Sequence, residues 1–299
     1  MIKTKDALNN AFIFFVSVAL SAVTFLLGAT PMRLLRLKLG PFKFWSLNLV
    51  VVAILLAMKI YLFAGLFLLY TVLIGVFSAF EESGYGLEKS FLSALGFAVF
   101  VGVVGTTSWM ISQSNSQWKE QITSKLEETV SLAKIAEPEK AAEIVETIFQ
   151  QFPSAVILTL VFGLFMALVM ERRFKDSMGL SSRPSFKLTD FKLPLEVVWV
   201  LILSIVLAFV VEGQIGFSKV LAVNVFNVTM GLYLIQGLAV LFRYFDVFKI
   251  SPFWRAIWLF ILLTHLYSLV LMSVIGVADI WVEFRARFAK QAARIKKSM

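Results

Sequence analysis

The residues best suited to chemistry in this sequence stand at the end of its last hydrophobic run, SVIGVADIWVEFRAR at 273–287. Asp279 and Glu283 are one helical turn apart, and Arg285 and Arg287 follow directly. An ionisable side chain at membrane depth marks a functional site by default. Because this cluster ends the run, it also fits an ion pair at the point where a helix leaves the membrane, and that is the simpler interpretation.

Residues for catalysis or metal binding are scarce. The only histidine is His265, inside the last hydrophobic run, and no H-E-x-x-H zinc pair is present. The chain has no cysteine, which excludes disulfides and thiolate ligands. A serine–histidine dyad would need a glycine-flanked nucleophile motif, which is missing. We therefore expect a protein that is not an enzyme and uses no cofactor or metal. His265 then forms interhelical hydrogen bonds or lines a cavity.

The run 220–242, LAVNVFNVTMGLYLIQGLAVLFR, is the most polar of the hydrophobic runs. At helical spacing, Asn224 and Asn227 share one face, and Tyr233 and Gln236 share another. An amide in hydrocarbon costs several kcal/mol when it has no partner, so both faces should meet protein or a wet cavity. Two interpretations remain open: these four residues line a ligand cavity, or they form structural hydrogen bonds.

A stripe of small side chains runs along the hydrophobic run 90–110. It recurs every fourth residue, at Ser90, Ala94, Ala98, Gly102 and Thr106. Such stripes let two backbones approach closely, which is how helices associate in lipid. The stripe therefore predicts either packing inside the bundle or docking of a partner membrane subunit.

The elements that must position these residues are membrane helices. Of the 299 residues, 59% are hydrophobic and 16% are charged, and the mean hydropathy is +0.86. Soluble domains are about half apolar and about a quarter charged. The additional hydrophobic residues are grouped into uncharged blocks. Most of these blocks reach the roughly 20 residues that a helix needs to cross the hydrocarbon layer. The sequence therefore predicts an all-α, polytopic transmembrane helix bundle.

We expect a single integral membrane domain over 1–299 with about eight spans, within a range of seven to nine. The spans are placed near 10–29, 44–58, 60–80, 90–110, 153–170, 194–212, 220–242 and 253–279. Residues 111–152 form a polar insertion of two short amphipathic helices, which either cap a cavity or simply connect two spans. Residues 280–299 form a basic tail. The seven prolines fall in expected loops or first turns, which weighs against a transporter with broken helices.

The net charge of +9 is dispersed among loops, so it indicates a membrane surface rather than nucleic acid as the partner. One arrangement has the N-terminus outside and 20 of the 28 Lys and Arg on the cytoplasmic side. Its cytoplasmic segments are 30–43, 81–89, 171–193, 243–255 and the basic tail. Eight spans would then leave the tail outside, unless a hairpin near Thr264 and His265 adds a ninth crossing with short arms. Eight spans with the N-terminus inside divides the charges evenly, so the number of crossings stays open.

Three stretches of the C-terminal half carry a recognisable pattern: FKLPLEVVWVLILSIVLAF from 191, NVFNVTMGLYLIQGLAVLFRYF from 224 and LMSVIGVADIWVEFRAR from 271. The pattern is a Phe and a Leu-Pro before one span, an Asn and a Gln-Gly in a later span, and a final Gly-x-x-Asp followed by Arg. Its positions are Phe191, Leu193, Pro194, Asn227, Gln236, Gly237, Gly276, Asp279 and Arg285. In this order the chain resembles the YybS-like family of predicted bacterial membrane proteins (domain of unknown function 2232).

The resemblance implies a multi-pass protein of the bacterial cytoplasmic membrane, with a distant similarity to substrate-binding subunits of energy-coupling factor transporters. It implies no established activity. Two hypotheses follow: a small-molecule binding or transport component with an unidentified ligand, or a scaffold that assembles with cell-envelope or division proteins. The partners are then the lipid bilayer and a membrane subunit. The terminal motif is interpreted as a packed helix end, with Gly276 for close approach and Asp279 paired with a nearby Arg.

Overall fold

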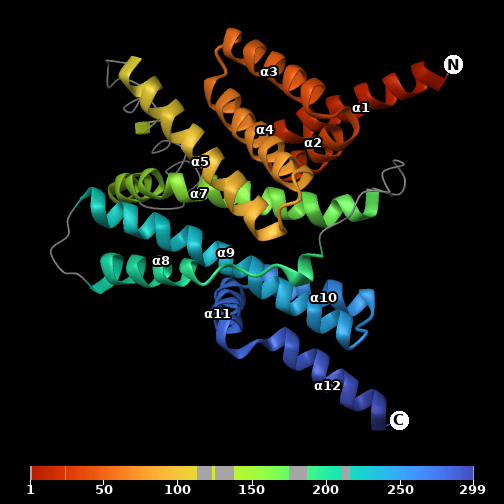
Figure 1. The fold of residues 1–299 in the computed structure, drawn as a ribbon. Helices are drawn as coiled ribbons and strands as arrows, with labels where there is room; N and C mark the ends of the chain where they lie inside the picture. The colour runs from red at the N-terminus through yellow and green to blue at the C-terminus, as the bar shows by residue number, and fades with distance from the viewer. Residues whose placement is uncertain are drawn as a thin grey trace.

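The computed structural model describes residues 2–23, 25–112, 123–124, 138–174, 187–210 and 216–298 (Figure 1). These residues are almost entirely helical, and no strand occurs among them. In hydrocarbon every backbone N–H and C=O must find its partner within the protein, and a helix provides this inside one segment. The predicted all-α class is confirmed.

The N-terminal half is built around its fourth helix. Its helices are α1 (Ile2–Val23), α2 (Phe25–Leu39), α3 (Pro41–Ala57), α4 (Tyr61–Glu82) and α5 (Leu87–Ser112). α1 packs mainly on α2, whereas α2, α3 and α5 all contact α4. Gly28 lets α1 and α2 approach closely, because a Cβ there would lie 2.0 Å from the Ser21 Oγ.

The C-terminal half is built around α9 (Phe217–Val247), which lies beside the long helix α7 (Pro138–Phe174) in Figure 1. The remaining elements are a 3-10 turn (Leu188–Asp190), α8 (Glu196–Ile205) with a π-helical turn (Val206–Val210), α10 (Pro252–Thr264), α11 (Leu266–Val282) and α12 (Phe284–Ser298). α8, α11 and α12 all pack against α9, and α7 joins the two halves because it contacts both α2 and α9.

Among the described residues, four helices are long and apolar enough to cross a membrane: Tyr61–Glu82, Leu87–Ser108, Glu143–Glu171 and Phe217–Val247. The same part of the chain has three shorter apolar helices: Asn10–Ser21, Pro41–Ala57 and Glu196–Phe209. α10 and α11 pass the same test only as a pair, and the pair is bent by 106°. The break falls at His265, where the sequence placed a hairpin as one alternative. The figure of about eight crossings remains a prediction.

The structure departs from the sequence-based layout at α2 and α7. Residues 30–39, which counted as part of a loop, belong to α2, and most of them are buried. Residues 138–152, which were assigned to the insertion, form the first turns of α7. Pro31 and Pro153 therefore lie inside helices. Neighbouring helices can satisfy the backbone groups that an internal proline frees. Most of the insertion, including the expected lid, lies outside the described residues.

Candidate functional site

The residues of the C-terminal motif meet at one junction, where α9, α11 and the segment 187–195 come together. Gly276 of α11 lies directly on α9, because a Cβ there would be 2.0 Å from the carbonyl oxygen of Tyr233. Gly237 of α9 faces the carbonyl oxygen of Met272 at the same distance. Backbone atoms cannot move aside as side chains do, so both positions require glycine for this crossing.

Gln236 ties three segments together at this junction. Its side chain is fully buried. The Oε1 atom accepts a hydrogen bond from the N–H of Leu193 (2.8 Å), and Nε2 donates to the carbonyl oxygen of Gly276 (2.9 Å). Both ends of the amide are thus paired, as burial away from water requires. Gln236 therefore holds the segment 187–195 and α11 against α9.

Arg285 closes the junction from the side of α12. Its Nε and Nη2 donate to the Asp279 Oδ2 at 3.1 and 2.7 Å. Its Nη1 donates to the carbonyl oxygens of Thr189 (3.2 Å) and Phe191 (2.8 Å). Glu283 ends α11 in the left-handed region (φ 51°), and this turn brings Arg285 back toward Asp279. Only 1% of Asp279 is exposed, so the pair lies inside the protein rather than on its surface.

The other polar residues of α9 connect it to α7. The Asn224 Oδ1 accepts a hydrogen bond from the N–H of Ser154 (2.8 Å), and its Nδ2 donates to the carbonyl oxygen of Gln150 (2.7 Å). An undisturbed helix would pair these two backbone groups with each other. They flank Pro153, so Asn224 supplies partners where the proline disturbs the helix. Asn227 donates to the Ser154 Oγ at 3.4 Å.

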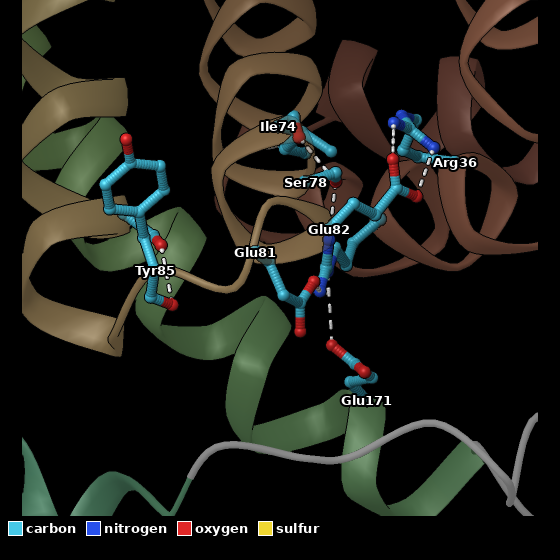
Figure 2. Close-up of polar contacts among 9 residues, drawn as sticks. Arg36, Ile74, Ser78, Glu81, Glu82, Tyr85 and Glu171 are labelled. Atoms are coloured by element: carbon cyan, nitrogen blue, oxygen red, sulfur yellow. Dashed lines mark hydrogen bonds and ion pairs between the residues drawn. The ribbon is translucent and has the colours of Figure 1, made fainter.

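A second buried cluster joins α2, α4 and α7 (Figure 2). The fully buried Arg33 donates from Nε to the Glu171 Oε2 at 3.1 Å, from Nη1 to the Ser78 Oγ and from Nη2 to Glu81. Its guanidinium carbon lies 5.0 Å from the centre of the Phe77 ring, an attractive cation–π contact. One arginine thus uses all three of its nitrogens to link three helices.

Arg36 follows Arg33 by one helical turn in the sequence. It faces Glu82, as Figure 2 shows. Its Nη1 and Nη2 donate to the two carboxylate oxygens at 3.1 and 2.8 Å, the bidentate geometry that suits a guanidinium. Glu81 and Glu82 end α4, and Glu171 lies in the last turns of α7. A carboxylate near a helix C-terminus faces the negative end of the helix dipole, so these acids require the cations of α2.

Comparison with known protein families identifies the family of this chain. A family model described as a predicted membrane protein (DUF2232) matches residues 10–280. The chain belongs to this family. No curated protein and no solved structure matches the chain. The YybS-like resemblance is therefore confirmed, whereas the similarity to transporter subunits remains a prediction.

Of the nine residues on which the resemblance rests, all but Asn227 belong to the junction or to the 187–195 segment that it holds. The segment carries Phe191, Leu193 and Pro194, α9 carries Gln236 and Gly237, and Gly276, Asp279 and Arg285 follow. A depression of about 530 Å³ borders the junction and is lined by Lys192, Leu193, Pro194, Leu195, Ile280 and Trp281. In this chain these residues thus form a packing site at which separate segments are held together.

Of the other candidate residues of this DUF2232 protein, Tyr233 contributes its carbonyl oxygen to the junction, and the rest lie elsewhere. His265 is exposed at the break between α10 and α11. Tyr233 is fully buried, and its hydroxyl has no hydrogen-bond partner in the described part of the chain. Ser90, Ala94 and Ala98 are buried within the chain, where α5 packs mainly on α4. Gly102 faces Leu69 of α4, and Thr106 is exposed.

Sequence reasoning missed the Arg33 cluster because Arg33 and Arg36 were counted in a loop. A usable signal was present: two arginines one turn apart, and acids at the ends of two hydrophobic runs. Nothing in the sequence says that these groups meet, because Arg33 and Glu171 are 138 positions apart. Within the described ranges, no group of three or more His, Cys, Asp or Glu is placed to hold a metal ion.

Proposed function

We propose that this DUF2232 protein is a non-catalytic assembly partner in the bacterial cytoplasmic membrane, and that α5 is the helix that contacts the partner subunit. The exposure of α5 carries the proposal. Within the chain, 28% of the apolar stretch of α5 is buried, whereas the other three long spans are 44%, 56% and 61% buried. Of these four spans, α5 has the largest share of its surface available for another protein.

The free face of α5 has the side chains that favour a helix–helix contact. Phe97, Phe100, Val103 and Val104 are exposed large apolar residues. Among the described residues, a Cβ at Gly105 would meet no atom within 4 Å, so no packing in that part of the chain accounts for this glycine. A glycine inside a helix costs about 1 kcal/mol relative to alanine. Small residues beside large ones let a second helix approach closely in lipid, which would offset that cost.

The polar residues of α9 support assembly over solute binding. The amides of Asn224 and Gln236 already have partners in α7, α11 and the segment 187–195. An amide that holds two protein groups would have to break those bonds before it could bind a solute. These residues therefore act in the packing of the bundle.

Site-specific photo-crosslinking in cells tests the proposal. A photoreactive residue replaces Phe100 on α5 or, as a matched control, Trp199 on α8; these side chains are 63% and 68% exposed. We expect a discrete protein adduct at position 100 and lipid adducts alone at position 199. Gly105→Leu should remove the adduct without lowering the yield of folded protein, because the added side chain meets open space. Lipid adducts alone at both positions would contradict the proposal.

A second candidate, solute transport, is favoured by the Arg33 cluster. Charged groups inside membrane proteins mark ion and substrate pathways, and Glu82 in this cluster is 38% exposed at its side chain. Thermal-shift measurements on purified protein with vitamins and metal ions test it. A stabilising ligand whose effect disappears in Glu82→Gln would support transport, and melting temperatures unchanged by every ligand would remove it.

A further inference from the structure

Exposed aromatic residues stand just before α12 and at the start of α10. Trp281 lies three positions before α12, and Phe253 and Trp254 begin α10; all three are large exposed side chains. Tryptophan collects at the level of the lipid headgroups because its ring is apolar and its N–H is polar. The first turn of α12 therefore starts close to headgroup depth.

The apolar face of α12 is held against the end of α9. The Phe288 ring centre lies 5.4 Å from that of Tyr244 and 6.3 Å from that of Phe248. Arg285 fastens the same turn to Asp279. These contacts fix the direction in which α12 leaves the bundle, and they leave Arg287 and Lys290 exposed.

The charge of α12 has one sign. Its sequence, FRARFAKQAARIKKS, contains no acidic residue. The basic residues are Arg285, Arg287, Lys290, Arg294, Lys296 and Lys297. Arg285 is paired with the buried Asp279. The turn after α9 adds Lys249, which is also exposed. This end of the molecule therefore carries a group of cations without acids in the same helix.

We infer that α12 binds the anionic headgroups of phospholipids and lies along the bilayer surface. Lys and Arg near such a surface are attracted within a Debye length, about 8 Å at physiological salt. A helix that starts at headgroup depth lies next to this negatively charged surface whether or not a partner protein is bound to α5. The inference is independent of the role proposed for α5, because it concerns the other end of the chain.

A single spin label tests the inference. The natural chain has no cysteine, so Ala289→Cys, at an exposed position of α12, accepts one label. The full-length protein is placed in nanodiscs of phosphatidylcholine alone or mixed equally with phosphatidylglycerol. In the nanodiscs with phosphatidylglycerol we expect the label to move more slowly than in phosphatidylcholine alone. There we also expect the label to be more accessible to oxygen than to a water-soluble nickel complex. High salt should reverse both changes. Equal label motion and accessibility in the two lipids would overturn the inference.

A charge variant and its matched control complete the test. The variant changes Arg287, Lys290, Arg294 and Lys296 to Gln, and it keeps Arg285 so that the pair with Asp279 remains. The control removes the same charge elsewhere, by changing Lys119, Lys125, Lys134 and Lys140 to Gln. We expect the variant to lose the response to phosphatidylglycerol and the control to keep it. Equal loss in both proteins would show a net-charge effect and overturn a specific role for α12.

Discussion

The chain buries charge in two regions that are built in opposite ways. Asp279 and Arg285 are six positions apart, and one left-handed residue between them brings the two together. Arg33 instead meets groups that are 45, 48 and 138 positions away, on two other helices. The local pair stabilises the end of one helix, whereas the distant cluster holds three helices in their packing arrangement. The regions should therefore respond differently when a charge is removed.

The largest effect is expected from Arg33→Met, which leaves the buried Glu171 and the partly buried Glu81 without their cation. Removing one partner of a buried ion pair costs about 3–5 kcal/mol. We expect a large drop in the yield of monodisperse protein and a lower unfolding midpoint in SDS titration. Arg33→Lys, which keeps the charge but loses the three-way geometry, is the matched control and should be milder. A midpoint equal to that of the natural protein would mean that the cluster does not hold the three helices.

A smaller effect is expected from Asp279→Asn in the local pair. Arg285 keeps its bonds to the carbonyl oxygens of Thr189 and Phe191, and 15% of its side chain remains exposed to solvent. Hydrogen bonds to charged groups contribute roughly 1.5–3 kcal/mol, and we expect a loss in that range. A double-mutant cycle with Arg285→Met measures the coupling. If the two substitutions are additive, the pair contributes nothing beyond separate contacts.

Gly276→Ala tests the junction without changing its charge. The added methyl group would meet the carbonyl oxygen of Tyr233, so α9 and α11 must separate. Overpacking of this kind costs about 1–3 kcal/mol. Gly65→Ala on α4 is the control, because a Cβ there meets nothing within 4 Å. We expect Gly65→Ala to be neutral or to stabilise by up to about 1 kcal/mol. Equal unfolding midpoints for the two variants would argue against a tight crossing.

The smallest effect is expected at the edge of the distant cluster, from Glu82→Gln. This carboxylate is 38% exposed, and exposed ion pairs contribute about 0–1 kcal/mol. The midpoint in SDS titration should therefore stay close to that of the natural protein. A loss as large as that of Arg33→Met would show that Arg36 depends on Glu82 as Arg33 depends on its buried partners.

The same contrast explains what the sequence could predict. Hydropathy predicts helices reliably, because lipid leaves the backbone few alternatives. The terminal motif was readable because Gly276, Asp279 and Arg285 lie within ten positions. Arg33 was placed in a loop because hydropathy treats a charge as the end of a span. Only the fold shows that Glu171 compensates this charge. Asn224 is similar: its polarity was visible, but its role beside Pro153 depends on how α7 meets α9.

The bend at His265 has a consequence for the sides of the membrane. α10 and α11 have 13 and 17 residues, about 20 and 25 Å of helix, against roughly 30 Å of hydrocarbon. Sharply bent, the two helices can enter and leave by the same face and add no crossing. The bonds from Arg285 to Thr189 and Phe191 then place the start of the tail beside the segment after α7.

On this basis the basic tail shares a side with the segments 171–193 and 243–255 without a ninth crossing. Single cysteines at Lys187 and Ala289, both exposed, should react with a membrane-impermeant maleimide from the same side. Labelling from opposite sides would show that α10 and α11 together cross the bilayer. The bend at His265 would thus place fifteen Lys and Arg side chains, more than half of those in the chain, on one side of the membrane.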